Sequence, residues 1–336
     1  MNRLSRRSFL LASGAAGLSY RGLATSSASE PGKLARPYKR PNVLYGLTTG
    51  SWGLVTPPGK PLPLLQILDE TAASGFNGIR LTGYPGILEK NNVSVDQLGD
   101  ELQKRGLVFS TISFGGHYRD RKQQKEILAR LRNVLEVHQK FGATAATFFP
   151  SSGVQPGEDE HRAYEDTFRF YNQMGKMAVQ EYGVRMGVHN LPGSLISTPQ
   201  QIDRFLEHTD SRYVFCAWDT AHLLLDGCDI AATFRKSLKR IVYLDFEDAT
   251  RNPSKEDFVA PNGQRFAGDT ARGQFYSSSQ DLGRGEIDYP TIMGILAEDN
   301  YRGWIIPDLH TVRVSAMESW RIAMAYIRRE LDPVYQ

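Results

Sequence analysis

The sequence predicts an α/β protein of the (β/α)8 TIM-barrel class, and three observations support this prediction. From residue 43 onward, apolar runs of strand length alternate with segments whose apolar residues recur at helical spacing. The alternation yields eight strands, each followed by a helical pattern. Ionisable side chains follow several of these strands directly, and that is where a barrel of parallel strands presents its chemistry.

The predicted elements follow one another at regular spacing. Helices are expected at residues 64–73, 95–104 and 230–238, around residues 127–138 and 168–175, and near the C-terminus. Thr198 and Gln201 around Pro199 form a capping-box pattern, which predicts a further helix start. Met317, Trp320, Met324 and Ile327 recur at helical spacing, which is typical of packing against the barrel. The strands are expected at residues 43–47, 78–81, 108–112, 145–149, 185–188, 214–218, 241–244 and 304–306.

One long segment interrupts this regularity after the seventh strand. Residues 249–283 are polar and rich in Gly, Ser and Asn, yet they include Phe258, Phe266, Phe275 and Tyr276. A loop of this length is either functional or disordered. The aromatic residues favour a folded lid over the mouth of the barrel.

The N-terminal residues read as an export signal. Ser5-Arg6-Arg7-Ser8-Phe9-Leu10 is a twin-arginine pattern, a short apolar stretch follows, and Ala24 or Ala28 is a plausible cleavage point. We therefore predict a signal peptide at 1–28, a linker at 29–42 and the barrel at 43–336, with passage through the twin-arginine (Tat) translocon to a periplasmic or secreted location. The alternative is a basic, disordered N-terminus.

The charge of the remaining chain is nearly balanced. The signal segment holds four arginines and no acidic residue, so 36 Lys and Arg remain against 37 Asp and Glu. This balance predicts no nucleic-acid partner, and after signal cleavage no membrane partner. Of the two cysteines, Cys216 lies in a predicted strand, which favours a buried free thiol over a disulfide with Cys228.

The candidate chemical groups gather at the strand ends. They are His117 after strand three, His189 after strand five, Asp219 and His222 after strand six, Asp245, Glu247 and Asp248 after strand seven, and Asp308 and His310 after strand eight. His189, Asp219, Asp245 and Asp308 would combine one imidazole with three carboxylates. Such a set suits a divalent metal ion, Mn²⁺, Mg²⁺ or Co²⁺, with Zn²⁺ as an alternative. The ion would polarise a substrate carbonyl.

Several short motifs occur along the barrel region in a fixed order. They are Gly75-Phe76-Asn77-Gly78-Ile79, Lys104-Arg105-Gly106-Leu107, Trp218-Asp219-Thr220-Ala221-His222, Arg240-Ile241-Val242-Tyr243, the segment 282–290 and Tyr301-Arg302-Gly303-Trp304. In order and spacing they resemble the xylose isomerase-like, AP-endonuclease-type barrel family of sugar (phosphate) isomerases and epimerases. The resemblance covers residues 43–330 and implies a TIM barrel, a carbohydrate substrate and a divalent metal.

The resemblance also implies roles for individual residues. The family holds its metal with Glu, Asp, His and Glu, at positions that match His189, Asp219, Asp245 and Asp308, so only Asp219 is unchanged. His222 matches a further family histidine near the substrate. The two family glutamates also transfer protons, which points to His189 and Asp308.

Proton transfer has further candidates among the strand-end residues. A metal-bound His189 would be a poor base because its lone pair is committed, and Asp308 is shorter than Glu. His117, His222, Glu247 and His310 are the substitutes, and His222 and His310 are also expected to contact substrate. Trp52 and Tyr84 would stack on a sugar ring, or else pack at the rim.

Three functions remain open from the sequence. The first is an exported, metal-dependent isomerase or epimerase that moves a proton next to a carbonyl of a small carbohydrate. The second is a lyase or hydratase that acts on keto-glycosides in the same barrel. The third is a degenerate barrel that binds a sugar or a partner without turnover.

Overall fold

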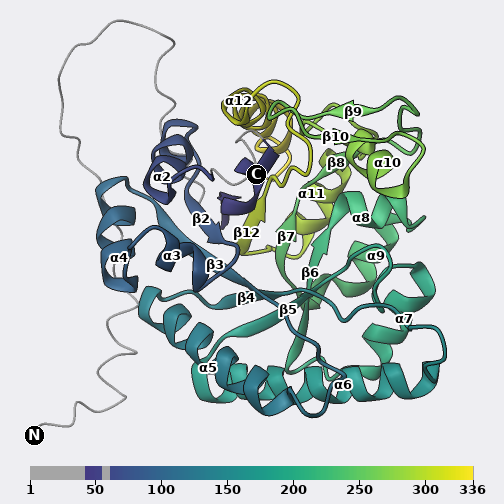
Figure 1. Ribbon diagram of the computed structural model, residues 1–336. Helices are drawn as coiled ribbons and strands as arrows, with labels where there is room; N and C mark the ends of the chain where they lie inside the picture. Colours follow the sequence, from purple (N-terminus) through teal and green to yellow (C-terminus); the bar gives the residue numbers. More distant parts are fainter. Residues whose placement is uncertain (1–41, 55–60, 336) are drawn as a thin grey trace, which may run out of the picture. The chain divides into compact units, whose positions relative to one another are not determined.

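The computed structural model describes residues 42–54 and 61–335 (Figure 1). The predicted signal peptide and linker residues 29–41 lie outside the described residues, so the export signal stays a prediction. Among the helices of the described ranges, none is both long enough and apolar enough to cross a bilayer.

Eight parallel strands close into a barrel, as the sequence predicts. Around the barrel each strand pairs with its neighbours in chain order, and the eighth returns to pair with the first. The predicted strand positions are confirmed to within two residues at either end. The strands are β1 (Val43–Thr48), β2 (Gly78–Leu81), β3 (Val108–Phe114), β4 (Ala145–Phe148), β5 (Arg185–His189), β6 (Val214–Asp219), β7 (Ile241–Asp245) and β12 (Gly303–Ile306).

The helices form a ring outside the strands (Figure 1). The predicted capping box is present: Thr198 Oγ1 accepts from the Gln201 backbone N–H, and Gln201 Oε1 accepts from the Thr198 N–H. The helices are α2 (Leu64–Ala73), α3 (Gly86–Lys90), α4 (Val95–Lys104), α5 (Gln124–Phe141), α6 (Glu160–Met177), α7 (Pro199–His208), α8 (Thr220–Leu225), α9 (Ile230–Ser237), α11 (Tyr289–Glu298) and α12 (Ala316–Tyr326).

A small apolar layer inside the barrel supports the strand ends. Ala217, Tyr243 and Ile306 are fully buried and pack together. Because side chains alternate along a strand, the residues two positions further on point to the same side. On β6 and β7 these residues are Asp219 and Asp245, and Asp308 follows two residues after the end of β12.

The segment after β7 is folded and has its own small core. Phe258, Ala260 and Phe266 are buried there, and Tyr276 packs against them. We call residues 249–283 the lid. The short elements of this region are β8 (Asp248–Ala249), β9 (Phe258–Val259), β10 (Arg265–Phe266), α10 (Ala271–Ser278) and β11 (Ser279–Gln280).

Asp248 ties the far end of the lid back to β7. Its carboxylate accepts the backbone N–H groups of Gly283 and Gly285 at 2.9 Å and of Ile287 at 3.4 Å. A Cβ on Gly285 would lie 2.1 Å from Asp248 Oδ1, so the loop approaches this closely only with glycine there. The family-like segment 282–290 therefore wraps around the buried carboxylate of Asp248, and we call this arrangement the clasp.

Both cysteines are buried free thiols, as the strand position of Cys216 favours.

Candidate active site and metal centre

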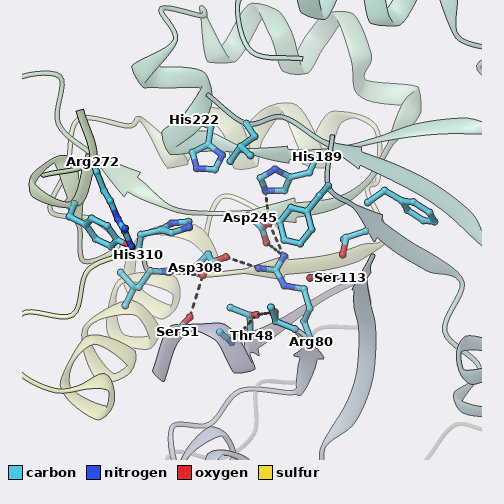
Figure 2. A pocket seen from close by; sticks show the side chains of 18 of the residues that line it. Thr48, Ser51, Arg80, Ser113, His189, His222, Asp245, Arg272, Asp308 and His310 are labelled. Carbon is cyan, nitrogen blue, oxygen red and sulfur yellow. Dashed lines mark hydrogen bonds and ion pairs between the residues drawn. The ribbon is translucent and has the colours of Figure 1, made fainter. Parts of the chain in front are cut away.

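A cavity of about 360 Å³ opens at the C-terminal ends of the strands. Its floor and walls come from β1, β2, β5, β7 and the segment after β12, and lid residues complete one side (Figure 2). The volume suits a small molecule such as a sugar. The side chains used below that line it are Arg80, His189, His222, Asp245, Gln264, Arg272, Tyr276, Asp308 and His310.

An arginine inside the barrel holds two of the carboxylates. Arg80 Nη1 lies 2.6 and 2.7 Å from the two carboxylate oxygens of Asp245, and Nη2 lies 2.6 Å from Asp308 Oδ2 (Figure 2). The guanidinium also lies 5.8 Å from the ring centre of Tyr243 in the layer below. The strand pairing shifts register between Ile79 and Arg80, and such a shift re-aims the side chain that follows.

This arginine changes the metal set that the sequence predicts. Asp245 and Asp308 share one guanidinium, and although Asp245 also lies 3.1 Å from His189, the group of candidate ligand atoms around His189 and Asp219 includes neither of these two carboxylates. Reasoning from the sequence missed Arg80 as a site residue. The sequence nevertheless contained an indication, because a charged residue within the short apolar strand 78–81 is buried and then needs counter-charges.

The structure instead brings His222 together with two members of the predicted set. One ligand atom from each of His189, Asp219 and His222 lies within 4.8 Å of the other two. His189 Nε2 is 3.7 Å from Asp219 Oδ2 and 3.1 Å from Asp245 Oδ2. All three residues are buried.

Each residue of this cluster carries one buried atom that lacks a hydrogen-bond partner. The atoms are His189 Nδ1, Asp219 Oδ2 and His222 Nε2. Buried polar atoms are normally paired, so three orphans in one cluster need a cause. His222 Nδ1 lies 3.0 Å from the Asn190 carbonyl oxygen, an arrangement that leaves Nε2 as the free lone pair. Two imidazoles and a carboxylate with free atoms fit a divalent ion, and the nitrogen content favours Zn²⁺ more than the predicted set did.

A second pair lies beside the cluster on the lid side. Glu247 is fully buried, and its Oε2 lies 2.8 Å from His310 Nδ1. Ser279 and the His310 backbone N–H donate to its other oxygen. The His310 side chain is about one-third exposed, and His310 lines the cavity (Figure 2). A buried carboxylate that orients an imidazole toward a cavity is an arrangement used for proton transfer.

The electrostatics follow from these pairs. Burial lowers the pKa of His189, but the charges of Asp219 and Asp245 and the hydrogen bond with Asp245 outweigh burial and raise the pKa to about 9. Burial likewise opposes the charge of Glu247, which raises the pKa of His310 to about 10. The His310 ring therefore carries a proton at neutral pH. The charge of Arg80 lowers the pKa of Asp245 despite its burial.

Three predicted site residues lie elsewhere. Trp52 is 2% exposed, packs against Trp320 with ring centres 5.6 Å apart, and donates to Glu70, so it offers no face to a sugar. Tyr84 is half-buried against the core and does not line the cavity. His117 is exposed on the loop after β3 and also lies outside the cavity lining. Trp52 and Tyr84 are thus packing residues, the alternative to stacking on a sugar ring.

The family model for xylose isomerase-like TIM barrels matches residues 68–330. The chain belongs to this family. Among curated relatives, the inosose dehydratase of Lactiplantibacillus plantarum is 24% identical over 291 residues, covering 81% of this chain and 90% of that protein. The inosose dehydratase of Clostridium tetani is 28% identical over 277 residues, covering 79% and 89%.

Solved structures of similar fold include the IOLI protein with a bound zinc atom. It is 14% identical, covers 87% of this chain and 99% of its own, and has a TM-score of 0.67. Sugar epimerases also occur among the structures of similar fold. These curated relatives are named as dehydratases, whereas the sequence motifs alone suggest an isomerase.

Proposed function

We propose that this protein is a dehydratase, a lyase that removes water or an alcohol next to the ketone of a keto-sugar or keto-glycoside. The observation that carries the proposal is the Glu247–His310 pair beside the His189–Asp219–His222 cluster in one cavity. The relatives named inosose dehydratase support the same reaction class.

The reaction needs one proton removed and one delivered. The proton on the carbon next to the ketone leaves, its electron pair forms the new double bond, and the oxygen on the next carbon departs with a proton. His310 is protonated and faces the cavity, so it is placed to protonate the departing oxygen. Asp308, a carboxylate of the cavity wall, is placed to accept the proton from carbon.

A divalent ion held by His189, Asp219 and His222 would polarise the ketone oxygen and acidify the neighbouring carbon. The residues contribute the site itself: His222 is oriented by the Asn190 carbonyl, and Asn190 also exchanges hydrogen bonds with the Asp219 backbone. Through these hydrogen bonds to both His222 and Asp219, Asn190 joins the end of β5 to the end of β6.

The test compares His310→Gln with His117→Gln in the purified mature protein. His117 is a matched control because it is exposed and lies outside the cavity. The substrates are an inosose and a 3-keto-glucoside in deuterated water, with and without Zn²⁺. Loss of one water or release of the aglycone, seen by mass spectrometry, would support a dehydratase. We expect His310→Gln to reduce kcat by about 100-fold or more and His117→Gln to leave it unchanged.

Other outcomes select the other functions. Solvent deuterium in an intact sugar, without elimination, would identify an isomerase or epimerase, the second candidate that the epimerases of similar fold support. Binding of the sugar with neither reaction would identify a non-catalytic barrel. Equal kcat for His310→Gln and the wild type would contradict the role given to His310.

We further propose that the protein acts outside the cytoplasm, because residues 5–10 carry the twin-arginine pattern. Cell fractionation of the full chain, against a variant with Arg6→Lys and Arg7→Lys, tests this. The proposal predicts that the wild type is processed and exported and that the variant is retained. Equal retention of both would refute it.

A further inference from the structure

An arginine of the lid reaches the cavity on a stack of aromatic rings. Arg272, in α10, lies 5.3 Å from the ring centre of Phe266 and 5.7 Å from that of Tyr276. The two rings stack with centres 4.0 Å apart, and Phe258 packs behind them. These contacts hold the guanidinium beside the rings without using its N–H groups.

Arg272 differs from the other arginines of the lid region in its polar partners. Within the part of the chain that the structure describes, no carboxylate or carbonyl accepts a hydrogen bond from its guanidinium. Each of its neighbours has such a partner: Arg251 pairs with Glu286, Arg265 with Asp257, Arg284 with Asp281, and Arg313 donates to the Ser277 and Ser279 carbonyls. Arg272 lines the cavity together with Gln264, Tyr276 and His310, and Figure 2 shows its side chain beside His310.

We propose that Arg272 is a specificity residue that binds a carboxylate on the substrate, so that the substrate is a keto-sugar acid. The inference rests on the proposed function and narrows its substrate class. A planar guanidinium held in place by stacking is suited to bidentate binding of a carboxylate. Of the other arginines in the described ranges, only Arg80 lines the cavity, and its charge is already shared by Asp245 and Asp308. One available guanidinium matches a singly charged carboxylate better than a doubly charged phosphate.

The experiment measures binding by calorimetry, so it does not depend on turnover. The probes are 5-keto-D-gluconate, the neutral ketose D-fructose and D-fructose 6-phosphate. The proteins are wild type, Arg272→Gln, Arg272→Lys and the control Arg265→Gln, which changes a lid arginine outside the cavity lining. We expect wild type and Arg265→Gln to bind the keto acid about 10- to 100-fold more tightly than fructose.

In Arg272→Gln the preference for the keto acid should disappear, while fructose binding changes less than about twofold. Arg272→Lys should recover part of the preference, because an ammonium group keeps the positive charge but lacks the two parallel N–H donors of a guanidinium. The inference is overturned if Arg272→Gln keeps the preference, if wild type shows none, or if the phosphate binds most tightly. An elimination reaction without this preference would leave the proposed function standing, and the preference without elimination would leave only the carboxylate site.

Discussion

Replacing Arg80 by methionine tests the ion network at the centre of the barrel. Methionine keeps much of the side-chain length and removes the charge. The side chains of Arg80, Asp245 and Asp308 are 6%, 1% and 12% exposed. The substitution therefore strands one fully buried carboxylate and one nearly buried carboxylate without their counter-ion.

The expected cost follows from this burial. Removing one partner of a buried ion pair destabilises a protein by about 3–5 kcal/mol, because the remaining charge stays uncompensated. Burial raises the pKa of Asp245, and the charge of Arg80 is the largest influence that lowers it. Without Arg80 the folded-state pKa of Asp245 therefore rises, although the hydrogen bond and the charge of His189 still lower it. A group with a raised folded-state pKa loses stability as pH rises through that pKa, so the variant should lose more at pH 8 than at pH 5.

The assay is thermal and urea unfolding of Arg80→Met at both pH values, in EDTA so that metal binding does not contribute. For a barrel of this size, 4 kcal/mol corresponds to a fall in Tm of roughly 8 °C. Arg235→Met is the control: Arg235 pairs with Glu298 on the surface, and such a pair is worth about 1 kcal/mol or less. Arg80→Met combined with Asp245→Asn should recover part of the loss, because the most buried stranded charge is gone.

A loss for Arg80→Met no larger than that of the surface control at pH 8 would refute this reasoning. So would a larger loss at pH 5 than at pH 8. Adding Zn²⁺ afterwards gives a further comparison, because Asp245 lies 3.1 Å from His189 and would be free to bind metal in the variant. We expect Zn²⁺ to raise the Tm of Arg80→Met more than that of the wild type.

Three further predictions concern single residues. Asp219→Asn keeps an oxygen able to cap α8 but removes the carboxylate of the His189–Asp219–His222 cluster. Bound metal, measured by elemental analysis, should then fall from about one ion per chain to almost none. An unchanged metal content would contradict the assignment of Asp219 as a ligand. Asp248→Asn should destabilise the clasp by about 2–4 kcal/mol and speed proteolysis within the lid, whereas Asp269→Asn, an exposed lid position, should do neither. Burial lowers the pKa of His138 to about 4. Between pH 6.5 and pH 4 only the unfolded chain therefore protonates this imidazole, and the free energy of unfolding should fall by about 3 kcal/mol over that range. A His138→Gln variant with an equally steep pH dependence would show that another group is responsible.

The place of the site residues at the mouth of the barrel could be predicted, because each of the eight strands ends at the same face of the barrel. Apolar runs identify the strands, and parallel strands open at the same end. His189, Asp219 and Asp245 are the last residues of their strands, and Asp219 pairs in register with Asp245. Local pattern and strand geometry therefore suffice to gather these groups at one mouth.

The partners of those groups could not be predicted in the same way. Arg80 lies 165 positions from Asp245 and 228 from Asp308 in the chain, so only the closing of the barrel brings them together. The partnership takes two carboxylates out of the predicted metal set. Trp52 shows the same limit, since its position at a strand end says nothing of Trp320, which covers it.

The sequence by itself determined the fold class, the strand ends and the inventory of imidazoles and carboxylates, because these depend on periodicities only a few residues long. Tertiary structure alone decided which of these groups pair with one another. It assigned Asp245 and Asp308 to Arg80, left free atoms on His189, Asp219 and His222, and brought the lid residue Arg272 to the cavity wall. The physical reason is that charge pairing acts over a few ångströms in space, and residues far apart in the chain reach that distance only when the barrel closes and the lid folds over it.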